Sequence, residues 1–226
     1  YPQVQGMSMD PDENLATPGD TPPTSTAPWV MPGDYTVRLI AGGKTFREPL
    51  KVAMDPRVKT SLSDLEQQFK LAKSMFDGMI QANSALHEIK TLREQLKARS
   101  TQPPVAGAEP SIESKLDAIA GAEGAMRMFG RGPTPPPTLA VVRMQLARLL
   151  HSIESADAAP TAAQFEAFDT AAKPLPGLLE QWQQLKKNDL KALNEQLERQ
   201  HLAKIDLDRG KTGKSEMDEV DIGDEE

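Results

Sequence analysis

The first regular pattern along the chain is an alternation of apolar and polar residues, the period of a half-buried β-strand. It occurs twice, over residues 34–40 and 46–54, and the Gly42–Gly43 pair between the two runs suits a two-residue hairpin turn. Pro49 in the second run indicates an edge strand or a bulge, because proline cannot donate to a sheet. The pattern therefore predicts a β-hairpin within residues 29–58. Its apolar positions are Tyr35, Val37, Leu39, Phe46, Leu50, Val52 and Met54.

A lone hairpin is marginally stable in water, so this apolar face needs a cover. Two covers are compatible with the sequence. One is the proline-rich segment 1–28 together with Trp29, and the other is the rest of a sandwich that lies outside this chain. We favour the second, and we expect the missing strands to come from an upstream domain or from another copy of the chain. The helices that follow should not complete the hairpin alone.

From residue 61 the period changes to that of amphipathic helices. The first helix starts either at Ser63, which fits a capping box with Glu66, or at Ser61, which competes with it through Asp64. It should end near Arg99, and its apolar spacing alternates between four and three residues, as in the seam of a helical bundle. A helix this long needs partner helices. The seam positions are Leu65, Phe69, Ala72, Phe76, Met79, Asn83, Leu86, Ile89, Leu92 and Leu96.

Three further helical segments can supply those partners. A short one begins near Ser111, and another follows Thr138 as its cap, after a Gly/Pro-rich loop over 121–137. The last begins with a capping box at Thr161 and continues to about residue 200. The apolar positions of the third helix are Leu139, Val142, Leu146, Leu149 and Ile153, and those of the last are Phe165, Phe168, Ala172, Leu175, Leu179, Trp182, Leu185, Leu190, Leu193 and Leu197.

Pro174 and Pro176 should kink or break the last segment near residues 171–173, since proline removes backbone donors. The first and last segments have similar lengths. We therefore predict a mainly α fold, an antiparallel helical bundle over 61–200 with two long helices and two shorter ones alongside. The β-hairpin precedes this bundle.

Composition and charge narrow the classes of function. The chain has no cysteine, which excludes disulfides, thiol catalysis and thiolate metal sites, and its 4% of aromatic residues suits a helical bundle. The net charge of −7 lies at the ends: residues 1–28 carry −4, residues 205–226 carry −6 and the middle carries +3. This is not the basic footprint of a nucleic-acid-binding protein, and no apolar run is long enough to span a membrane. We expect 1–28 to be a linker or loop and 205–226 to be a disordered, dispensable acidic tail.

Patterns that would carry catalysis or ligand binding are not found. Asp206–Gly210 resembles the start of a calcium loop, but Lys211 and Met217 stand where the loop needs glycine and glutamate. The glycine-rich stretches near residues 121 and 130 lack the preceding strand and the lysine of a phosphate loop. We therefore expect no catalytic residue, no metal site and no cofactor. His87, His151 and His201 are interpreted as solvated or seam-edge residues, and Met75, Met79, Met126, Met128 and Met144 as core rather than a binding groove.

A resemblance to a known family lies around the junction of hairpin and helix. The segments that carry it are Pro32-Gly-Asp-Tyr-Thr-Val-Arg-Leu39, Gly43-Lys44, Pro49-Leu-Lys-Val-Ala-Met-Asp-Pro-Arg-Val58 and Ser63-Asp-Leu-Glu-Gln-Gln-Phe69. They resemble the C-terminal region of bacterial sortilin-like BNR-repeat proteins, which are often labelled glycosyl hydrolases. Later segments at 137–139, 158–161 and 189–194 are also similar, so the resemblance covers residues 28–200. The Met54–Val58 junction is its most specific part.

The resemblance implies that the hairpin is the remnant of an immunoglobulin-like domain and that a preceding β-propeller is absent from this chain. Any carbohydrate-cleaving carboxylates would then lie on that propeller, and the protein would be secreted or periplasmic. Because the chain begins at Tyr1 and shows no signal peptide, we expect a processed product or a fragment.

Two classes of function follow. The first is a non-catalytic accessory region that packs on, or spaces, the propeller. The second is a self-associating or partner-binding helical module, a homo-oligomer included, that uses the bundle seam or an edge of the hairpin. The expected partners are therefore the upstream propeller or immunoglobulin-like domain, or other copies of the chain.

Overall fold

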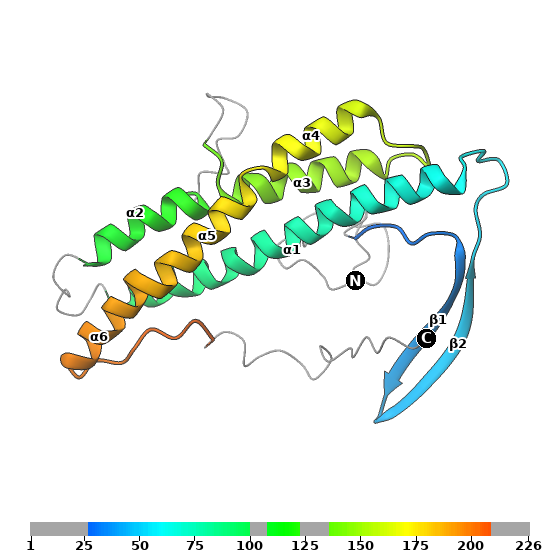
Figure 1. The fold of residues 1–226 in the computed structure, drawn as a ribbon. Coiled ribbons are helices and arrows are strands. Elements are labelled where there is room, and N and C mark those ends of the chain that lie inside the picture. The colour runs from blue at the N-terminus through cyan, green and yellow to red at the C-terminus, as the bar shows by residue number, and fades with distance from the viewer. Residues whose placement is uncertain (1–26, 100–107, 123–135, 209–226) are drawn as a thin grey trace, which may run out of the picture. The chain divides into compact units, whose positions relative to one another are not determined.

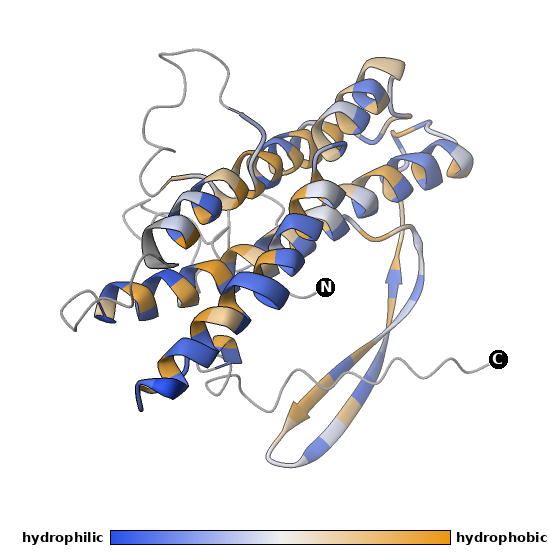
Figure 2. Ribbon diagram, turned by 60° about the vertical axis from the view of Figure 1, so that its left-hand side comes forward, coloured by the Kyte–Doolittle hydropathy of each residue, from blue (hydrophilic) through white to orange (hydrophobic). Residues whose placement is uncertain are grey.

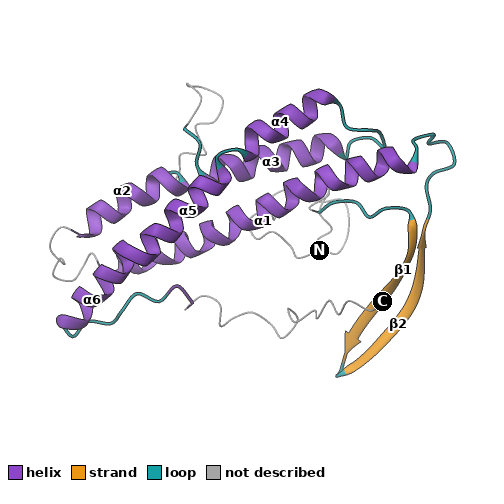
Figure 3. Ribbon diagram, viewed as in Figure 1, coloured by secondary structure: helices purple, strands orange, loops and turns teal. Residues whose placement is uncertain are grey.

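The computed structural model describes residues 27–99, 108–122 and 136–208. These residues are mainly helical and carry a two-stranded antiparallel sheet, as the sequence predicts (Figures 1 and 3). Most of the predicted linker 1–28, most of the loop 121–137 and most of the acidic tail lie outside the described residues.

The chain divides into two compact units. Unit 1 contains the described residues up to Asn83 together with Val141–Leu175, and unit 2 contains those of Ser84–Ala140 together with those from Pro176 onward.

The hairpin belongs to unit 1 and consists of β1 (Gly33–Ala41) and β2 (Lys44–Val52). Gly42 and Gly43 connect the strands with φ values of 56° and 71°. Positive φ at both central positions is the requirement of a type I′ turn, whose twist matches that of the strands and which glycine satisfies without strain. The predicted hairpin is confirmed.

The register of the hairpin is continuous from the turn to its open end. Tyr35 pairs with Leu50, Leu39 pairs with Phe46, and Thr36 pairs with Pro49. The expected alternative of a bulge at Pro49 is therefore wrong, and the proline is accommodated because β2 is an edge strand of a two-stranded sheet.

The helices of unit 1 are the first part of α1 (Leu62–Arg99), α3 (Leu139–Ile153) from Val141, and α4 (Ala162–Ala172). Of the two possible starts of α1, the structure uses Ser61. The Ser61 hydroxyl accepts the N–H of Asp64 at 3.1 Å and donates to Asp64 Oδ2 at 2.7 Å. The capping box at Ser63 is therefore wrong.

The cap of α4 is confirmed in full. The Thr161 hydroxyl accepts the Gln164 N–H at 3.2 Å, and the Gln164 side chain accepts the Thr161 N–H at 2.8 Å. Two backbone donors at the start of the helix are thereby satisfied.

The buried stripe of α1 in unit 1 is wider than the predicted seam. Leu71, Met75 and Ala82 are buried as well, whereas the predicted seam residues Phe69 and Asn83 are only half-buried. A strict three-four seam suits one partner helix, and a wider stripe serves a helix with neighbours on more than one side. The Cβ that an alanine would carry at position 78 would lie 2.9 Å from Leu146 and 3.4 Å from Leu175, so α1 approaches other parts of unit 1 closely at Gly78. The buried apolar residues of this part of α1 are Leu65, Leu71, Ala72, Met75, Phe76, Met79 and Ala82.

Asn83 has a polar role that explains its place on the stripe. Its Oδ1 accepts a hydrogen bond from Arg143 Nη1 on α3 at 2.9 Å. Burial lowers the pKa of the Arg143 guanidinium, because desolvation penalises the charged form. The amide oxygen therefore gives a partly desolvated cation a hydrogen-bond partner.

Unit 2 contains the rest of α1, α2 (Ala108–Ala120) and the last helical segment from Pro176 onward. That segment is interrupted where the prolines predict. Following the end of α4 in unit 1, α5 (Leu175–Leu185) begins directly after Pro174. The start of α2, by contrast, lies three residues before the predicted Ser111.

A π-helix (Lys186–Leu190) separates α5 from α6 (Lys191–Arg199) and was not predicted. The sequence carries a signal for it. The apolar spacing is three or four residues elsewhere in the segment but five between Leu185 and Leu190, which is the interval that a π-helical turn accommodates.

Polar contacts tie the helices of unit 2 together. Arg93 on α1 donates to Glu113 at 3.0 Å, to Asp117 at 2.6 Å and to the Gly121 carbonyl at 3.2 Å, and its own side chain is 11% exposed. An arginine held by two carboxylates and a carbonyl fixes α2 against α1 more firmly than an exposed ion pair would.

A second cluster joins α1 to α5 and the π-helix. The carboxylate of Glu88 accepts the indole N–H of Trp182 at 2.9 Å and the ammonium of Lys186 at 2.7 Å, and that ammonium lies 5.3 Å from the Trp182 ring centroid. Trp182 is 1% exposed, so this cluster satisfies the polar atom of a core residue.

The first residues of the predicted acidic tail are docked on unit 2. Ile205 is 5% exposed, and its N–H and carbonyl both bond to the Asn194 side chain, at 2.8 and 3.1 Å. Gln95 on α1 bonds to the N–H and carbonyl of Asp206 at 3.0 and 2.6 Å. The expectation of an undocked tail from residue 205 is therefore wrong for residues 205 and 206, because one isoleucine and two amide side chains outweigh the segment's charge.

Truncation tests this boundary. A chain ending at Asp208 should unfold at the same temperature as the full chain, whereas one ending at Lys204 should lose about 1.5–3 kcal/mol through the loss of buried Ile205. Thermal unfolding followed by circular dichroism measures both. Equal melting temperatures for the two truncated chains would show that the docked segment contributes nothing.

Candidate functional site

The two strands of the hairpin are exposed on both faces. Every residue from Asp34 to Lys51 is exposed, and large apolar side chains are among them: Val37 is 50%, Leu39 59% and Phe46 52% exposed. Figure 2 shows apolar residues in orange along both strands. The predicted need for a cover therefore stands, and the described helices do not provide it.

The register divides the hairpin into two faces of different chemistry. The apolar face contains one acid, Glu48, opposite Val37, and Lys44 beside the turn. The basic face contains three basic residues and one acid, together with Ile40. The members of the apolar face are Tyr35, Val37, Leu39, Phe46, Leu50 and Val52, and the charged members of the basic face are Asp34, Arg38, Arg47 and Lys51.

The base of the hairpin, unlike its strands, is tied to the helices of unit 1. The Trp29 N–H donates to Glu154 Oε1 at 2.7 Å, and Glu154 is only 9% exposed. The Thr60 hydroxyl donates to the Asp157 carbonyl, and the Gln68 side chain donates to the Ile153 and Ala156 carbonyls, both at 2.7 Å. A cavity of about 200 Å³ lies at this base, lined in part by Trp29, Val52 and Leu65.

The Met54–Val58 junction forms a tight turn between β2 and α1. The Asp55 carboxylate accepts the Arg57 N–H at 2.9 Å and the Arg57 guanidinium at 2.5 Å, and the Val58 N–H bonds to the Asp55 carbonyl at 2.9 Å. The side-chain hydrogen bond from Arg57 holds the pKa of Asp55 below its ordinary value. This turn therefore shapes the exit from the hairpin.

The histidines and methionines singled out in the sequence do not form a site among the described residues. His87, His151 and His201 are each exposed, and the described part of the chain holds no group of three or more acidic or histidine side chains placed to bind a metal ion. Met75 and Met79 are fully buried, so the interpretation of these two methionines as core is confirmed. Met126 and Met128 lie outside the described residues.

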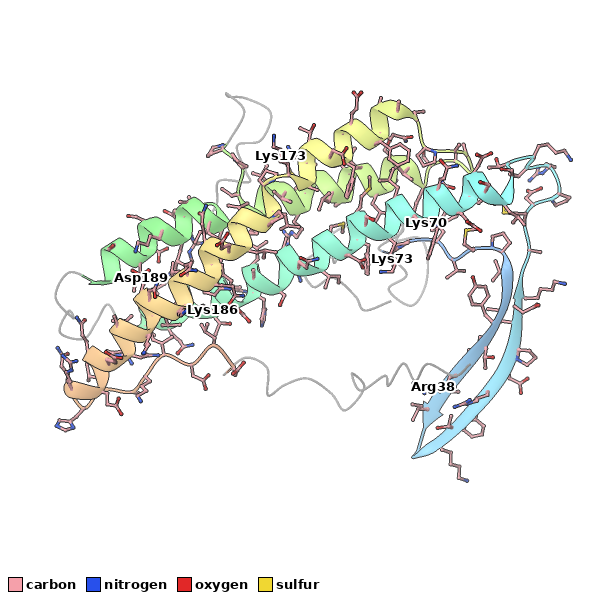
Figure 4. The ribbon with its side chains drawn as sticks, in the orientation of Figure 1. Arg38, Lys70, Lys73, Lys173, Lys186 and Asp189 are labelled. Carbon is pink, nitrogen blue, oxygen red and sulfur yellow. The ribbon has the colours of Figure 1, made fainter. Side chains whose placement is uncertain are left out.

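Unit 2 has a separate open groove of about 590 Å³ beside the π-helix. The Lys115 ammonium and the Asp189 carboxylate lie 2.6 Å apart at its edge, and Asp189 and Lys186 both belong to the π-helix (Figure 4). The remaining polar lining consists of exposed amide and acidic side chains on α5 and the π-helix. This ion pair satisfies the two charges locally, and the groove shows no convergent set of donors or acceptors that would select a ligand.

The arrangement that stands out is thus a hairpin anchored at its base and open along both strands. It offers backbone hydrogen-bonding edges and an apolar face, which are the means of binding another sheet.

A pair of apolar-to-aspartate substitutions tests whether the hairpin contributes to the helical core. Val37→Asp should change the free energy of unfolding of the helices by no more than about 0.5 kcal/mol, because the side chain already meets water. Met79→Asp, at a site with no exposure, should cost more than about 3 kcal/mol by burying an unpaired charge. Helical circular dichroism during denaturation measures both, and a Val37→Asp chain that melts like Met79→Asp would place the hairpin in the core.

Comparison with known proteins identifies no relative: no protein-family model, curated protein or solved structure matches this chain. None of the helices in the described part of the chain is both long and apolar enough to cross a membrane.

Proposed function

We propose that this chain is a non-catalytic accessory region that joins a β-structured domain through the apolar face of its hairpin. The observation that carries the proposal is a face of large apolar side chains left open on a hairpin whose base is fixed to unit 1. Burying one such side chain is worth about 1.5–3 kcal/mol, so a second sheet packed on this face would gain substantially.

The resemblance to sortilin-like BNR-repeat proteins supports the same reading. In that family the hairpin segment ends an immunoglobulin-like domain that follows a β-propeller. The missing strands would then come from the preceding domain of a secreted or periplasmic protein, and the helices would form the predicted antiparallel bundle that packs on or spaces it. The sharp turn at Asp55–Val58 suits a fixed junction between such a sandwich and the helices.

The apolar face can be tested with neighbouring residues that point to opposite sides of β1. Leu39→Asp, on the apolar face, should weaken binding of the chain to the domain that precedes it by about tenfold or more, because a charge replaces a buried contact. Ile40→Asp, on the basic face, makes the same chemical change and should leave affinity within about threefold, as expected of a surface site. Isothermal titration calorimetry measures both affinities.

Equal losses for the two variants would mean that the apolar face is not the contact. Unchanged affinity for Leu39→Asp, with binding intact, would place the interface elsewhere.

The non-catalytic part of the proposal has its own test. The isolated chain should turn over no substrate in a panel of glycans, because the sequence carries no pattern typical of a nucleophile–base pair or of paired catalytic carboxylates. Turnover that disappears when one Asp or Glu within residues 60–200 is changed to its amide would contradict this.

A further inference from the structure

The open edges of the hairpin are a different surface from its apolar face, and they are not equivalent. A two-residue type I′ turn makes its flanking residues, Ala41 and Lys44, a hydrogen-bonded pair, and the pairs then alternate along the ladder. Thr36 and Pro49 consequently form a non-hydrogen-bonded pair, so the Pro49 nitrogen points away from β1. The outer edge of β2 thus lacks a donor in its middle, which blocks regular pairing there.

The outer edge of β1 has no such interruption. The residues whose backbone groups point outward are the even-numbered ones, and each of them keeps its N–H. They are Asp34, Thr36, Arg38 and Ile40. In the part of the chain that the structure describes, β1 has β2 as its sole strand neighbour. The hairpin can therefore accept one more strand, and it can do so on β1.

One charge along this edge is placed unfavourably within the hairpin. Arg38 stands directly opposite Arg47 in the non-hydrogen-bonded pair, where side chains are closest, and like charges in that position repel. Within residues 27–99, 108–122 and 136–208, neither Arg38 nor Asp34 forms an ion pair. Figure 4 labels Arg38 on β1. Asp34 stands opposite Lys51, so the charge on this edge that faces a like charge is that of Arg38. A strand that brought an acid beside Arg38 would offset this repulsion.

The edge of β1 is itself such a strand. If two copies of β1 pair antiparallel about Thr36, Asp34 of each copy faces Arg38 of the other, and Thr36 faces Thr36. Opposite-charge and Thr–Thr pairs both stabilise antiparallel sheets. A register centred on residue 34 places Asp34 opposite Asp34, and one centred on residue 38 places Arg38 opposite Arg38. A register centred on residue 35 or 37 leaves both Asp34 and Arg38 opposite uncharged residues. The charges therefore select one register.

We propose that β1 pairs with β1 of a second copy of this chain, antiparallel and centred on Thr36, to make a four-stranded sheet. In this register Tyr35 lies beside Val37 of the second copy, so the two apolar faces become continuous. The contact is self-complementary, as twofold symmetry requires, and assembly stops at two copies because β2 forms both outer edges with Pro49 in each. The sheet still presents its apolar face, so this pairing is independent of the domain contact proposed above.

Sedimentation equilibrium of the full chain tests the pairing. The chain should dimerise in a concentration-dependent way, and Thr36→Pro should abolish dimerisation without changing helical circular dichroism.

Asp34→Arg alone and Arg38→Asp alone should each weaken the dimer by about tenfold, since two attractive pairs become repulsive. Mixing the two variants should restore a heterodimer, because every facing pair is then opposite in charge. Lys187→Asp, an exposed site in unit 2, makes the same charge change as Arg38→Asp and should have no effect.

Three results would overturn the inference. A chain that stays monomeric at every concentration rules out self-pairing, and if Thr36→Pro then weakens binding of the preceding domain, that domain supplies the strand. A dimer unaffected by Thr36→Pro forms through another surface. A dimer lost in Thr36→Pro but not rescued by mixing the charge variants uses β1 in a different register. None of these results bears on Leu39→Asp, which tests the apolar face separately.

Discussion

Two β-strands cannot bury their own apolar face, and the hairpin of this chain therefore depends on a second layer. A face made of Tyr35, Leu39, Phe46 and their neighbours is covered only by a second layer, and the described helices use their apolar stripes on one another. Phe76, Met79 and Leu146 are almost completely buried within unit 1, whereas Leu39 is more than half exposed. The core residues of the helices are therefore buried without the hairpin, whereas the helices leave the apolar face of the hairpin exposed.

The base of the hairpin explains why the exposed strands are more than a loose appendage. Glu154 receives the Trp29 N–H at one side of the base, and Thr60 bonds to the Asp157 carbonyl at the other. The Asp55–Arg57 turn then sets the direction in which the chain enters α1. A partner that binds the strands is thereby connected to unit 1 through fixed contacts, and less ordering entropy opposes binding than for an unanchored segment.

Local patterns predicted the elements well, and tertiary contacts account for what they missed. The Gly42–Gly43 pair determined turn and register together, and Pro174 marked the break between α4 and α5, because each acts through its own backbone. Ser61 and Ser63 are each followed three residues later by an acidic residue, so the sequence pattern does not decide which of them caps α1. Phe69 is half-buried and Leu71 buried because α1 has neighbours on more than one side, which a single seam does not encode. The docking of Ile205 depends on amide side chains at Gln95 and Asn194, far away in sequence. For the site, alternation predicted the apolar face and its need for a cover, whereas the position of Arg38 opposite Arg47 emerged only once the register was known.

Hydrogen exchange at individual backbone amides tests whether the hairpin is left uncovered, as it is among the described residues. The measurement is made on the chain alone, at a concentration where it is monomeric. The amides of Leu39 and Phe46, a hydrogen-bonded pair in the hairpin, should exchange orders of magnitude faster than those of Met75 and Met79 in α1, because a two-stranded sheet opens without unfolding the helices. Protection of the hairpin amides equal to that of the α1 core would instead mean that the chain supplies its own cover.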